Sequence, residues 1–411
     1  MAPLWLRPRS WPTLAVRLVL AVVAITVLYE STLATALVDR LVHPTPTIAA
    51  NGSGGLGVAS RPNVTAGIDP ASRPSRATPQ AMNILVMGID SRTGMTVAEQ
   101  NRYHLGTVGA DGSDTIMLVH LYADGQHATI INFPRDLYVE IPAWHRSDGK
   151  DLAAVKMKLN AAYARGDNGG LASDGPNLAI DTLETLTGIH IDHFMSINIP
   201  RLGALVTALG GVDVCLPQAV NDKESGLDLP KGVSHLDDVQ AVAYVRDRYT
   251  DTGDGPGDFG RIRRQQKFLS AMLKKVMSAG TLTNTGKLQQ FVGVLSDSLT
   301  MDSALDGKTL LTVASSLQGL STSKVTFTTV PIANDNYVVP GVGDTVLMDA
   351  TAAKRLFEAI NADKPIPTAT ATTARSTASG SAVPSATASA SVDPNNKTHT
   401  AADDPCAKSN G

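Results

Sequence analysis

Residues 241–266 read AVAYVRDRYTDTGDGPGDFGRIRRQQ, and they concentrate positive charge in a chain whose formal net charge is −3. The cationic side chains in and next to this stretch are Arg246, Arg248, Arg261, Arg263, Arg264 and Lys267. If residues 245–248 are extended, Arg246 and Arg248 point to one side of the backbone and Asp247 points to the other. This stretch is therefore the first candidate for a site that binds an anion.

A helix is predicted directly after the arginine pair, with Asp258 as its N-cap and residues 259–278 as its body. Arg261, Arg264 and Gln265 then share one face at spacings of three and four residues. Several guanidinium groups near a helix N-terminus favour a multiply charged anion, most simply a phosphate or a pyrophosphate. The alternative is a solvated basic helix whose arginines form only surface ion pairs.

Composition limits the possible classes of protein. A chain of 411 residues with 43% hydrophobic and 18% charged residues holds one large domain or two, plus tails. The acidic balance and the scarcity of aromatic residues argue against nucleic acid as a partner. Only two cysteines are present, which excludes a disulfide-rich scaffold and a cysteine-based metal site. Cys215 and Cys406 pair only if the tail folds back, and we expect Cys215 to be a buried strand residue instead.

The termini predict a membrane-anchored protein. Residues 1–40 are expected to form a cytoplasmic N-terminus and a transmembrane anchor, because three arginines in residues 1–17 precede an apolar segment at 18–38 that is long enough to span a bilayer. A cleaved signal peptide is the alternative, because residues 34–36 read ATA. Residues 41–81 are expected to be a flexible linker. Residues 364–411, rich in Ala, Ser, Thr and Pro, are expected to be a disordered tail.

The folded domain is expected at residues 82–363. Its hydrophobic patterns predict strands at 83–87, 115–121, 128–133, 194–198, 212–216 and 325–330. They predict helices at 152–164, 176–187, 201–209, 236–244, 303–317 and 351–362. Strands that alternate with helices favour an α/β fold, a three-layer α/β/α sandwich on a mixed twisted sheet.

Six motifs carry a resemblance to a known family. They are VRDRY with GDFGRIRRQQ in the opening stretch, NILVMGIDSR at 83–92, SDTIMLVH at 113–120, FPRDLYV at 133–139, KLNAAY at 158–163 and GGVDV at 210–214. In this order they resemble the LytR–CpsA–Psr family over roughly residues 82–363. Members of that family are membrane-anchored envelope enzymes that transfer glycopolymers from a polyprenyl pyrophosphate carrier to the cell wall.

Two aspartates are candidates for a metal site. Asp90 ends the first predicted strand and Asp114 opens the next, and acids at strand ends in an α/β sheet lie where ligands bind. Two carboxylates facing a pyrophosphate suit Mg²⁺. On spacing alone, one or both aspartates are equally well explained as turn caps. The resemblance implies that Asp90 and Asp114 are the metal ligands.

The resemblance also implies the residues that contact the substrate. The expected pyrophosphate ligands are Arg92, Arg135, Lys158, Arg246, Arg248, Arg261, Arg264 and Gln265. The residues expected to take part in catalysis are Arg135, Arg246, Arg248, Asp258, Arg261 and Gln265. For Lys158, solvent exposure is the alternative. One departure from the family pattern is Gly112, which stands where the family often has an arginine two residues before the second metal-binding aspartate.

The expected function is therefore that of a Mg²⁺-dependent phosphotransferase in the cell membrane, single-pass, with its catalytic domain outside the cytoplasm. Its expected partners are a polyprenyl-pyrophosphate-linked glycopolymer as donor and a hydroxyl of peptidoglycan or another wall glycan as acceptor. The resemblance further implies a lipid groove, for which the apolar residues of 178–186 and 202–209 are candidates, although such stripes also suit a core. Two alternatives stay open: a non-catalytic protein that binds the lipid or the wall glycan, and a transcriptional attenuator.

Overall fold

The computed structural model describes residues 73–75, 80–89, 95–105, 113–168, 173–250, 253–255, 257–277, 299–303, 305, 321–366, 398–403 and 406, leaving out the side chains of 199–201. Within these residues, no helix combines the length and the apolar character needed to cross a bilayer. The segment expected to be the anchor, 18–38, lies outside them, as does nearly all of the expected helix at 303–317.

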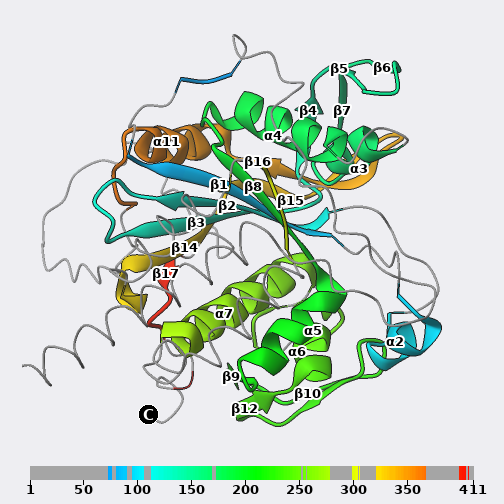
Figure 1. Cartoon of the computed structure of the whole chain (residues 1–411), viewed down its shortest axis with the longest axis vertical. Coiled ribbons are helices and arrows are strands. Elements are labelled where there is room, and N and C mark those ends of the chain that lie inside the picture. Colours follow the sequence, from blue (N-terminus) through cyan, green and yellow to red (C-terminus); the bar gives the residue numbers. More distant parts are fainter. Residues whose placement is uncertain are drawn as a thin grey trace, which may run out of the picture.

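The described strands form a seven-stranded mixed sheet at the centre of the molecule (Figure 1), in the order β13-β8-β1-β2-β3-β14-β17. β1 runs parallel to β8 and β3 runs parallel to β14, while the other neighbours are antiparallel. The strands are β1 (Met82–Ile89), β2 (Ser113–Leu121), β3 (Ala128–Phe133), β8 (His193–Asn198), β13 (Leu299–Met301), β14 (Val325–Thr329) and β17 (His399–Thr400). The expectation of an α/β fold on a mixed sheet is confirmed.

The sheet is apolar on both faces. Successive side chains of a strand point to opposite sides, and both sets are apolar in its central strands. On β1, Leu85 and Met87 belong to one core cluster and Ile84 belongs to another. The first cluster is covered by α4 (Asp174–Thr187) and α11 (Ala350–Asn361), and the second by α7 (Gly257–Met277). Figure 1 accordingly shows α3, α4 and α11 on one side of the sheet and α5, α6 and α7 on the other.

The remaining helices connect these layers. α5 and α6 pack with part of α7 around a further core cluster that contains Val206, Tyr244 and Phe268. α6 begins with a capping box in which Asp237 and Gln240 satisfy each other's main-chain N–H groups. The bounds are α2 (Val97–Arg102), α3 (Ala161–Asp167), α5 (Ile199–Ala208), α6 (Asp238–Arg246) and the 3-10 helix η1 (Thr322–Lys324).

Five two-stranded ribbons surround the central sheet, and of their strands the sequence predicted only β9, at residues 212–216. They are β4 (Tyr138–Ile141) with β7 (Val155–Lys158), β5 (Trp144–His145) with β6 (Asp151–Leu152), β9 (Val212–Leu216) with β12 (Gly232–Leu236), β10 (Val220–Asp222) with β11 (Leu227–Leu229), and β15 (Ile332–Val339) with β16 (Gly343–Met348). The helix expected at 152–164 is therefore wrong in its first half. Residues 155–158 alternate with a period of two and pair with β4, so the helix begins only at Ala161.

The C-terminal residues return to the domain. β17 pairs with β14, and a disulfide joins Cys406 to Cys215 on β9. The expectation that 364–411 is disordered is wrong for residues 364–366, 398–403 and 406, which the structure places. The expectation for Cys215 is also corrected: it lies on β9 as predicted, but it is half-buried and bonded rather than a fully buried free thiol.

The apolar stripes proposed for a lipid groove pack inside the protein. Leu178, Leu183 and their neighbours on α4 belong to the core cluster above the sheet, and Leu205 and Val206 on α5 are likewise buried. These residues are therefore accounted for by the core, as the alternative reading of the stripe predicts.

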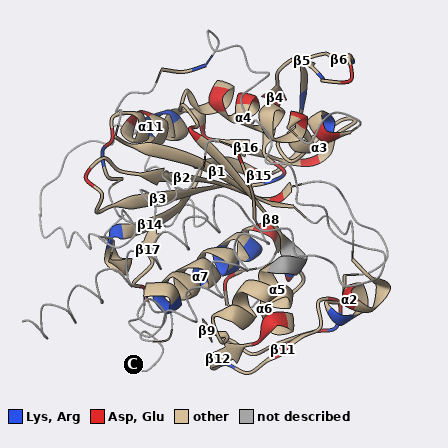
Figure 2. Ribbon diagram, viewed as in Figure 1, with Lys and Arg blue, Asp and Glu red and all other residues tan. Residues whose placement is uncertain are grey.

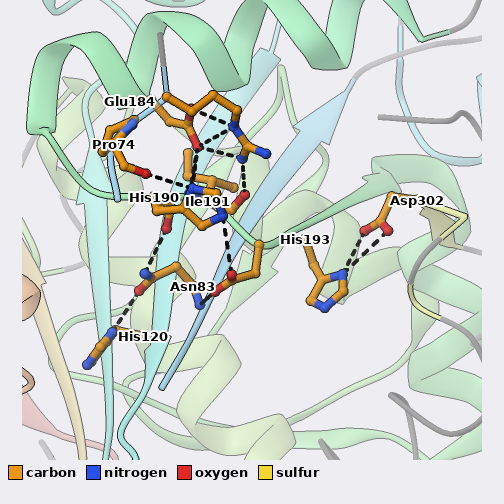
Figure 3. A network of polar contacts seen from close by, with 10 residues as sticks. Pro74, Asn83, His120, Glu184, His190, Ile191, His193 and Asp302 are labelled. Carbon is orange, nitrogen blue, oxygen red and sulfur yellow. Dashed lines mark hydrogen bonds and ion pairs between the residues drawn. The ribbon is translucent and has the colours of Figure 1, made fainter. Parts of the chain in front are cut away.

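A buried polar network attaches the chain preceding β1 to the domain (Figure 3). Arg73 donates from Nη2 to Glu184 Oε1 at 2.7 Å and to the carbonyl oxygen of Ile191 at 2.6 Å. Asn83 donates from Nδ2 to the carbonyl oxygen of His190 at 2.7 Å, and its Oδ1 lies 2.7 Å from His120 Nδ1. Residues 73–75, which the sequence assigned to the linker, thus contact α4 and the segment between α4 and β8.

Replacing Arg73 should destabilise the domain measurably. In Arg73→Ala, the carboxylate of Glu184, which is only 2% exposed, loses its guanidinium partner, and we expect the free energy of unfolding to fall by about 3 kcal/mol. Urea denaturation measures this loss. The matched control is Arg102→Ala, because Arg102 is 57% exposed in its ion pair with Asp238 and should contribute less than about 1 kcal/mol. Equal losses in the two variants would contradict this account.

Candidate functional site

The candidate site lies where α7 begins beside the start of β2. Gly255 and Gly257 adopt positive φ angles of 86° and 69°, which allow the sharp turn into the helix. Gly260 packs so closely on the carbonyl of Gly255 that a Cβ there would overlap it. Asp258 is not the N-cap expected from the sequence, because the helix already includes Gly257, and it lies in the first turn instead. Figure 2 shows the Lys and Arg positions along α7.

Arg261 is the centre of this site. Its side chain is enclosed, with 2% exposure. Nη2 donates to the carbonyl oxygen of Asp114 at 3.0 Å and lies 2.5 Å from Oδ1 of Asp258, while Nη1 lies 3.5 Å from Oδ1 of Asp114. Arg261 thus connects the first turn of α7 to the first residues of β2.

Arg135 approaches the same two carboxylates from the end of β3. Its Nη1 forms an ion pair with Oδ1 of Asp114, and its Nε lies 3.7 Å from Oδ1 of Asp258. Within the described part of the chain, the buried Nε atoms of Arg135 and Arg261 donate no hydrogen bond. The structure therefore brings together two arginines and two aspartates from three separate motifs.

The charges in this cluster change the pKa values of its members. Burial alone would raise the pKa of Asp114, but the guanidinium groups of Arg261 and Arg135 outweigh it and lower that pKa. Burial raises the pKa of Asp258 despite the opposing charges of Arg261 and Arg135. Burial also lowers the pKa of Arg261. The surroundings thus shift the pKa values of Asp114 and Asp258 in opposite directions, and perturbed pKa values are common at functional sites.

Lys158 and Asp136 extend the cluster. The ammonium group of Lys158, at the end of β7, lies 2.9 Å from Oδ1 of Asp136, and Oδ2 of the same carboxylate lies 3.5 Å from Nε of Arg135. Lys158 is half-buried and directed toward the site, in contrast to the alternative of solvent exposure. Sequence analysis missed Asp136 as a site residue, although its position directly after Arg135 was a usable signal.

Arg246 and Arg248 do not lie in one extended segment, which was the condition for the prediction that they point to one side. Arg246 is the last residue of α6, not part of an extended segment, and its Nη1 donates to the carbonyl oxygen of Tyr103 at 3.2 Å. Arg248, two residues further along, is half-buried, and its charge contributes to lowering the pKa of Asp114. Helix α6 thus includes both Val245 and Arg246 and ends at the C-cap Asp247.

Arg264 and Gln265 share the buried face of α7 with Arg261, as the spacing predicted. Arg264 is nevertheless 0% exposed, with its Nη2 donating to the carbonyl oxygen of Asp247. Gln265 donates from Nε2 to the carbonyl oxygen of Val245 at 3.1 Å. The pyrophosphate contact expected from Arg264 stays a prediction, and in this structure its guanidinium group is directed toward the end of α6. Both side chains attach the end of α6 to α7 and so fix the backbone beside Arg246.

The expected metal site is only partly described. Asp90, Arg92 and Gly112 lie outside the described residues. Among the described side chains, no group of three or more His, Cys, Asp or Glu could hold a metal ion. Asp114 alone still suits Mg²⁺, which binds through one or two carboxylates together with phosphate oxygens and water.

Replacing Asp258 with asparagine should raise the stability of the protein and lower its activity. Because burial raises its pKa above 3.8, the folded state holds this proton more tightly than the unfolded state does. Stability therefore falls as the pH rises through the raised pKa, and the cost persists at neutral pH. Asp258→Asn should unfold at a higher temperature than the parent at pH 7 and should lose this part of the pH dependence.

The same variant should slow the reaction proposed below by about 100-fold, the contribution typical of a group that moves a proton. Thermal unfolding between pH 3 and pH 8 and a transfer assay check the two effects. Asp228→Asn, on the exposed side of β11, is the matched control and should change neither. A variant that is less stable and equally active would refute the assignment of Asp258.

The chain is similar to several known proteins. The family model described as the LytR_cpsA_psr family matches residues 61–361. The cell wall biosynthesis protein LcpA of Corynebacterium glutamicum is 32% identical over 330 residues, which cover 76% of this chain and 61% of that protein. The polyisoprenyl-teichoic acid–peptidoglycan teichoic acid transferase TagU of Enterococcus faecalis is 32% identical over 227 residues, which cover 55% of this chain and 63% of that protein. The chain thus spans about three fifths of these relatives' length.

Solved structures with the same fold include TagV from B. subtilis, with a TM-score of 0.53 and 23% identity over 70% of this chain and 100% of that chain. An enzyme described as LytR-Csp2A-Psr from Actinomyces oris has a TM-score of 0.51 and 20% identity over 70% of this chain and 93% of that chain. At these identities the similarity shows the fold alone.

Proposed function

We propose, since this chain belongs to the LytR–CpsA–Psr family, that it is a phosphotransferase that moves a glycopolymer from a polyprenyl pyrophosphate carrier to a hydroxyl of the cell wall. The observation that supports this most strongly is the convergence of Arg135 and Arg261 on Asp114 and Asp258. The names of the relatives LcpA and TagU, which refer to cell wall biosynthesis and teichoic acid transfer, are consistent with it.

The arginines bind and orient the pyrophosphate. Arg135 and Arg261 reach the site from two different elements, so they hold oxygens on both sides of the phosphorus. Their charges are already fixed in place by Asp114 and Asp258, and they therefore stabilise the charge that develops on the leaving phosphate without further rearrangement. Arg248 adds positive charge near Asp114.

The proposed reaction is a displacement at phosphorus. The oxygen of the acceptor hydroxyl forms a bond to the phosphorus that carries the polymer, and the bond from that phosphorus to the bridging oxygen breaks. Polyprenyl phosphate leaves with that oxygen, and a phosphodiester joins the polymer to the wall. The hydroxyl proton passes to a carboxylate. Asp258, whose pKa burial raises, is a better acceptor for this proton than Asp114, whose pKa is lowered.

We propose Mg²⁺ as the cofactor, held by Asp114 and by Asp90 as the sequence suggests. A bound Mg²⁺ would neutralise charge on the phosphate oxygens. The protein's own contribution is to keep the Asp114 carboxylate ionised at neutral pH, because Arg261 and Arg135 lower its pKa.

We also propose that the chain is a single-pass membrane protein whose domain lies outside the cytoplasm. The disulfide between Cys215 and Cys406 supports this location, because disulfides persist mainly in oxidising compartments. A reporter fused to the end of the chain, active only when exported, tests the topology.

The decisive experiment incubates the purified full-length chain with a lipid-linked glycopolymer donor and peptidoglycan, with and without Mg²⁺. The proposal expects a phosphodiester between polymer and glycan, together with release of polyprenyl phosphate, and both products should decrease on chelation. Binding of the donor without either product would identify a non-catalytic binding protein. Release of the lipid phosphate without attachment to the wall would identify a hydrolase.

A further inference from the structure

Two tyrosines from separate ribbons form an aromatic surface beside the candidate site. The ring centroids of Tyr138 on β4 and Tyr337 on β15 are 6.4 Å apart, with an angle of 49° between the ring planes. Tyr337 is 40% exposed, and its neighbour Val338 is 61% exposed. Tyr138 is half-buried, so the exposed ring of Tyr337 and the ring beside it form a larger apolar surface than a single exposed side chain, and such patches often mark a binding site.

The fold holds Tyr337 in this position. The pairing of β15 with β16 shifts register between Asn334 and Tyr337, and such irregularities redirect side chains next to functional sites. Immediately after the shift, the buried hydroxyl of Thr345 on β16 donates to the carbonyl oxygen of Tyr337 at 2.5 Å. The exposed ring therefore stands on a fixed backbone.

The ribbon that carries Tyr138 presents balanced charge on its outer face. Its inner face packs Val139 and Met157 against the core. On the outer face, Tyr138 is opposite Lys158, and Glu140 is opposite Lys156. Lys158 in turn lies 2.9 Å from Asp136. Each lysine of this face is therefore matched by a carboxylate, and the β15–β16 ribbon adds only the exposed acids Asp335 and Asp344.

This surface is continuous with the candidate site. Tyr138 follows Arg135 by three residues, so their Cα atoms are at most about 11 Å apart. The main-chain N–H of Val346 on β16 donates to the carbonyl oxygen of Asp136 at 2.9 Å, which joins the two ribbons at that point. A polymer lying on the tyrosines can thus extend directly to the arginines.

We propose that the tyrosine surface, defined as Tyr138, Tyr337 and the outer face of β4 and β7, binds the neutral sugar backbone of the acceptor glycan. Aromatic faces are electron-rich and apolar, and they suit the C–H face of a sugar ring, while neighbouring carboxylates and ammonium groups suit its hydroxyls. The anionic donor polymer is a poorer fit, because the exposed charges here are balanced or negative. This inference rests on the proposed function, since it identifies the acceptor of the same reaction.

Binding and kinetics together test this inference. Oligomers of N-acetylglucosamine serve as the neutral glycan probe, and poly(glycerol phosphate) serves as the anionic one, each titrated calorimetrically into the full-length chain. We expect Tyr337→Ala and Tyr138→Ala to weaken binding of the neutral probe at least 10-fold and to raise KM for peptidoglycan by a similar factor. The kcat at saturating acceptor and the affinity for the lipid-linked donor should stay unchanged.

Two further variants sharpen the test. Tyr337→Phe keeps the aromatic ring and should bind the neutral probe as the parent does. Val338→Ala is the matched control, because it removes an even more exposed side chain from the next position of β15 and should have no effect.

The outcomes separate this inference from the proposed function. Neutral glycan binding that depends on Tyr337 would support the surface even if no transfer is observed. Normal transfer with an unchanged acceptor KM in both tyrosine variants would overturn the surface and leave the transferase proposal intact. Failure of the parent chain to bind the neutral probe, or stronger binding of the anionic probe through Tyr337, would also overturn it.

Discussion

Arg261→Ala should reduce polymer transfer by about 10³-fold, which is the loss typical of removing a charged donor that stabilises developing negative charge. Arg261 links the two aspartates of the site, because its two terminal nitrogens contact Asp114 and Asp258. The same substitution should also lower the free energy of unfolding, because the carboxylates of Asp114 and Asp258 lose a guanidinium partner.

The control variants distinguish catalysis from folding. Arg263→Ala removes an arginine from the same helix two residues further along, where the side chain contacts the carbonyl of Asp254 instead of the cluster. It should transfer polymer at the parent rate. Arg261→Lys keeps the charge but loses the planar fork, and it should recover only part of the activity. A transfer assay measures the activity of these variants, and thermal unfolding measures their stability. The assignment of Arg261 is rejected if Arg261→Ala stays active, or if it is inactive only because it is unfolded.

Loss of the disulfide should cause the largest change in stability. Cys215 and Cys406 are separated by 191 residues, and a cross-link that closes a loop of this length restricts the unfolded chain strongly. We expect Cys406→Ser to lower the free energy of unfolding by about 4 kcal/mol. The loss should also release β17 from β14, since only two residue pairs join those strands.

Denaturation of the oxidised parent, the single variant and the double variant Cys215→Ser/Cys406→Ser measures this effect. The double variant should resemble the single one, because either substitution breaks the same bond. A reducing agent should destabilise the parent to the level of the variants and leave the double variant unchanged. A parent chain that is insensitive to reduction would show that the tail contributes nothing to stability.

The regular parts of the fold could be predicted because their patterns are local. Strands β1, β2 and β3 are continuous or alternating apolar runs, and α11 has both a helical apolar stripe and the N-cap Asp349. Most strands of the small ribbons were missed because they are only two to eight residues long, and such short stretches carry a weak periodic signal. β4 and β7 illustrate this, since only pairing reveals that Tyr138 is opposite Lys158.

The sequence by itself determined which motifs are candidates for the site, namely those that contain Asp114, Arg135 and Arg261. Only the tertiary structure decided which of these charges meet. It turned Arg264 toward Asp247 and Arg246 toward Tyr103, and it brought Arg135 and Arg261 to the same two aspartates. The physical reason is that the helical period fixes which side chains share a face, whereas burial and long-range pairing determine what that face contacts.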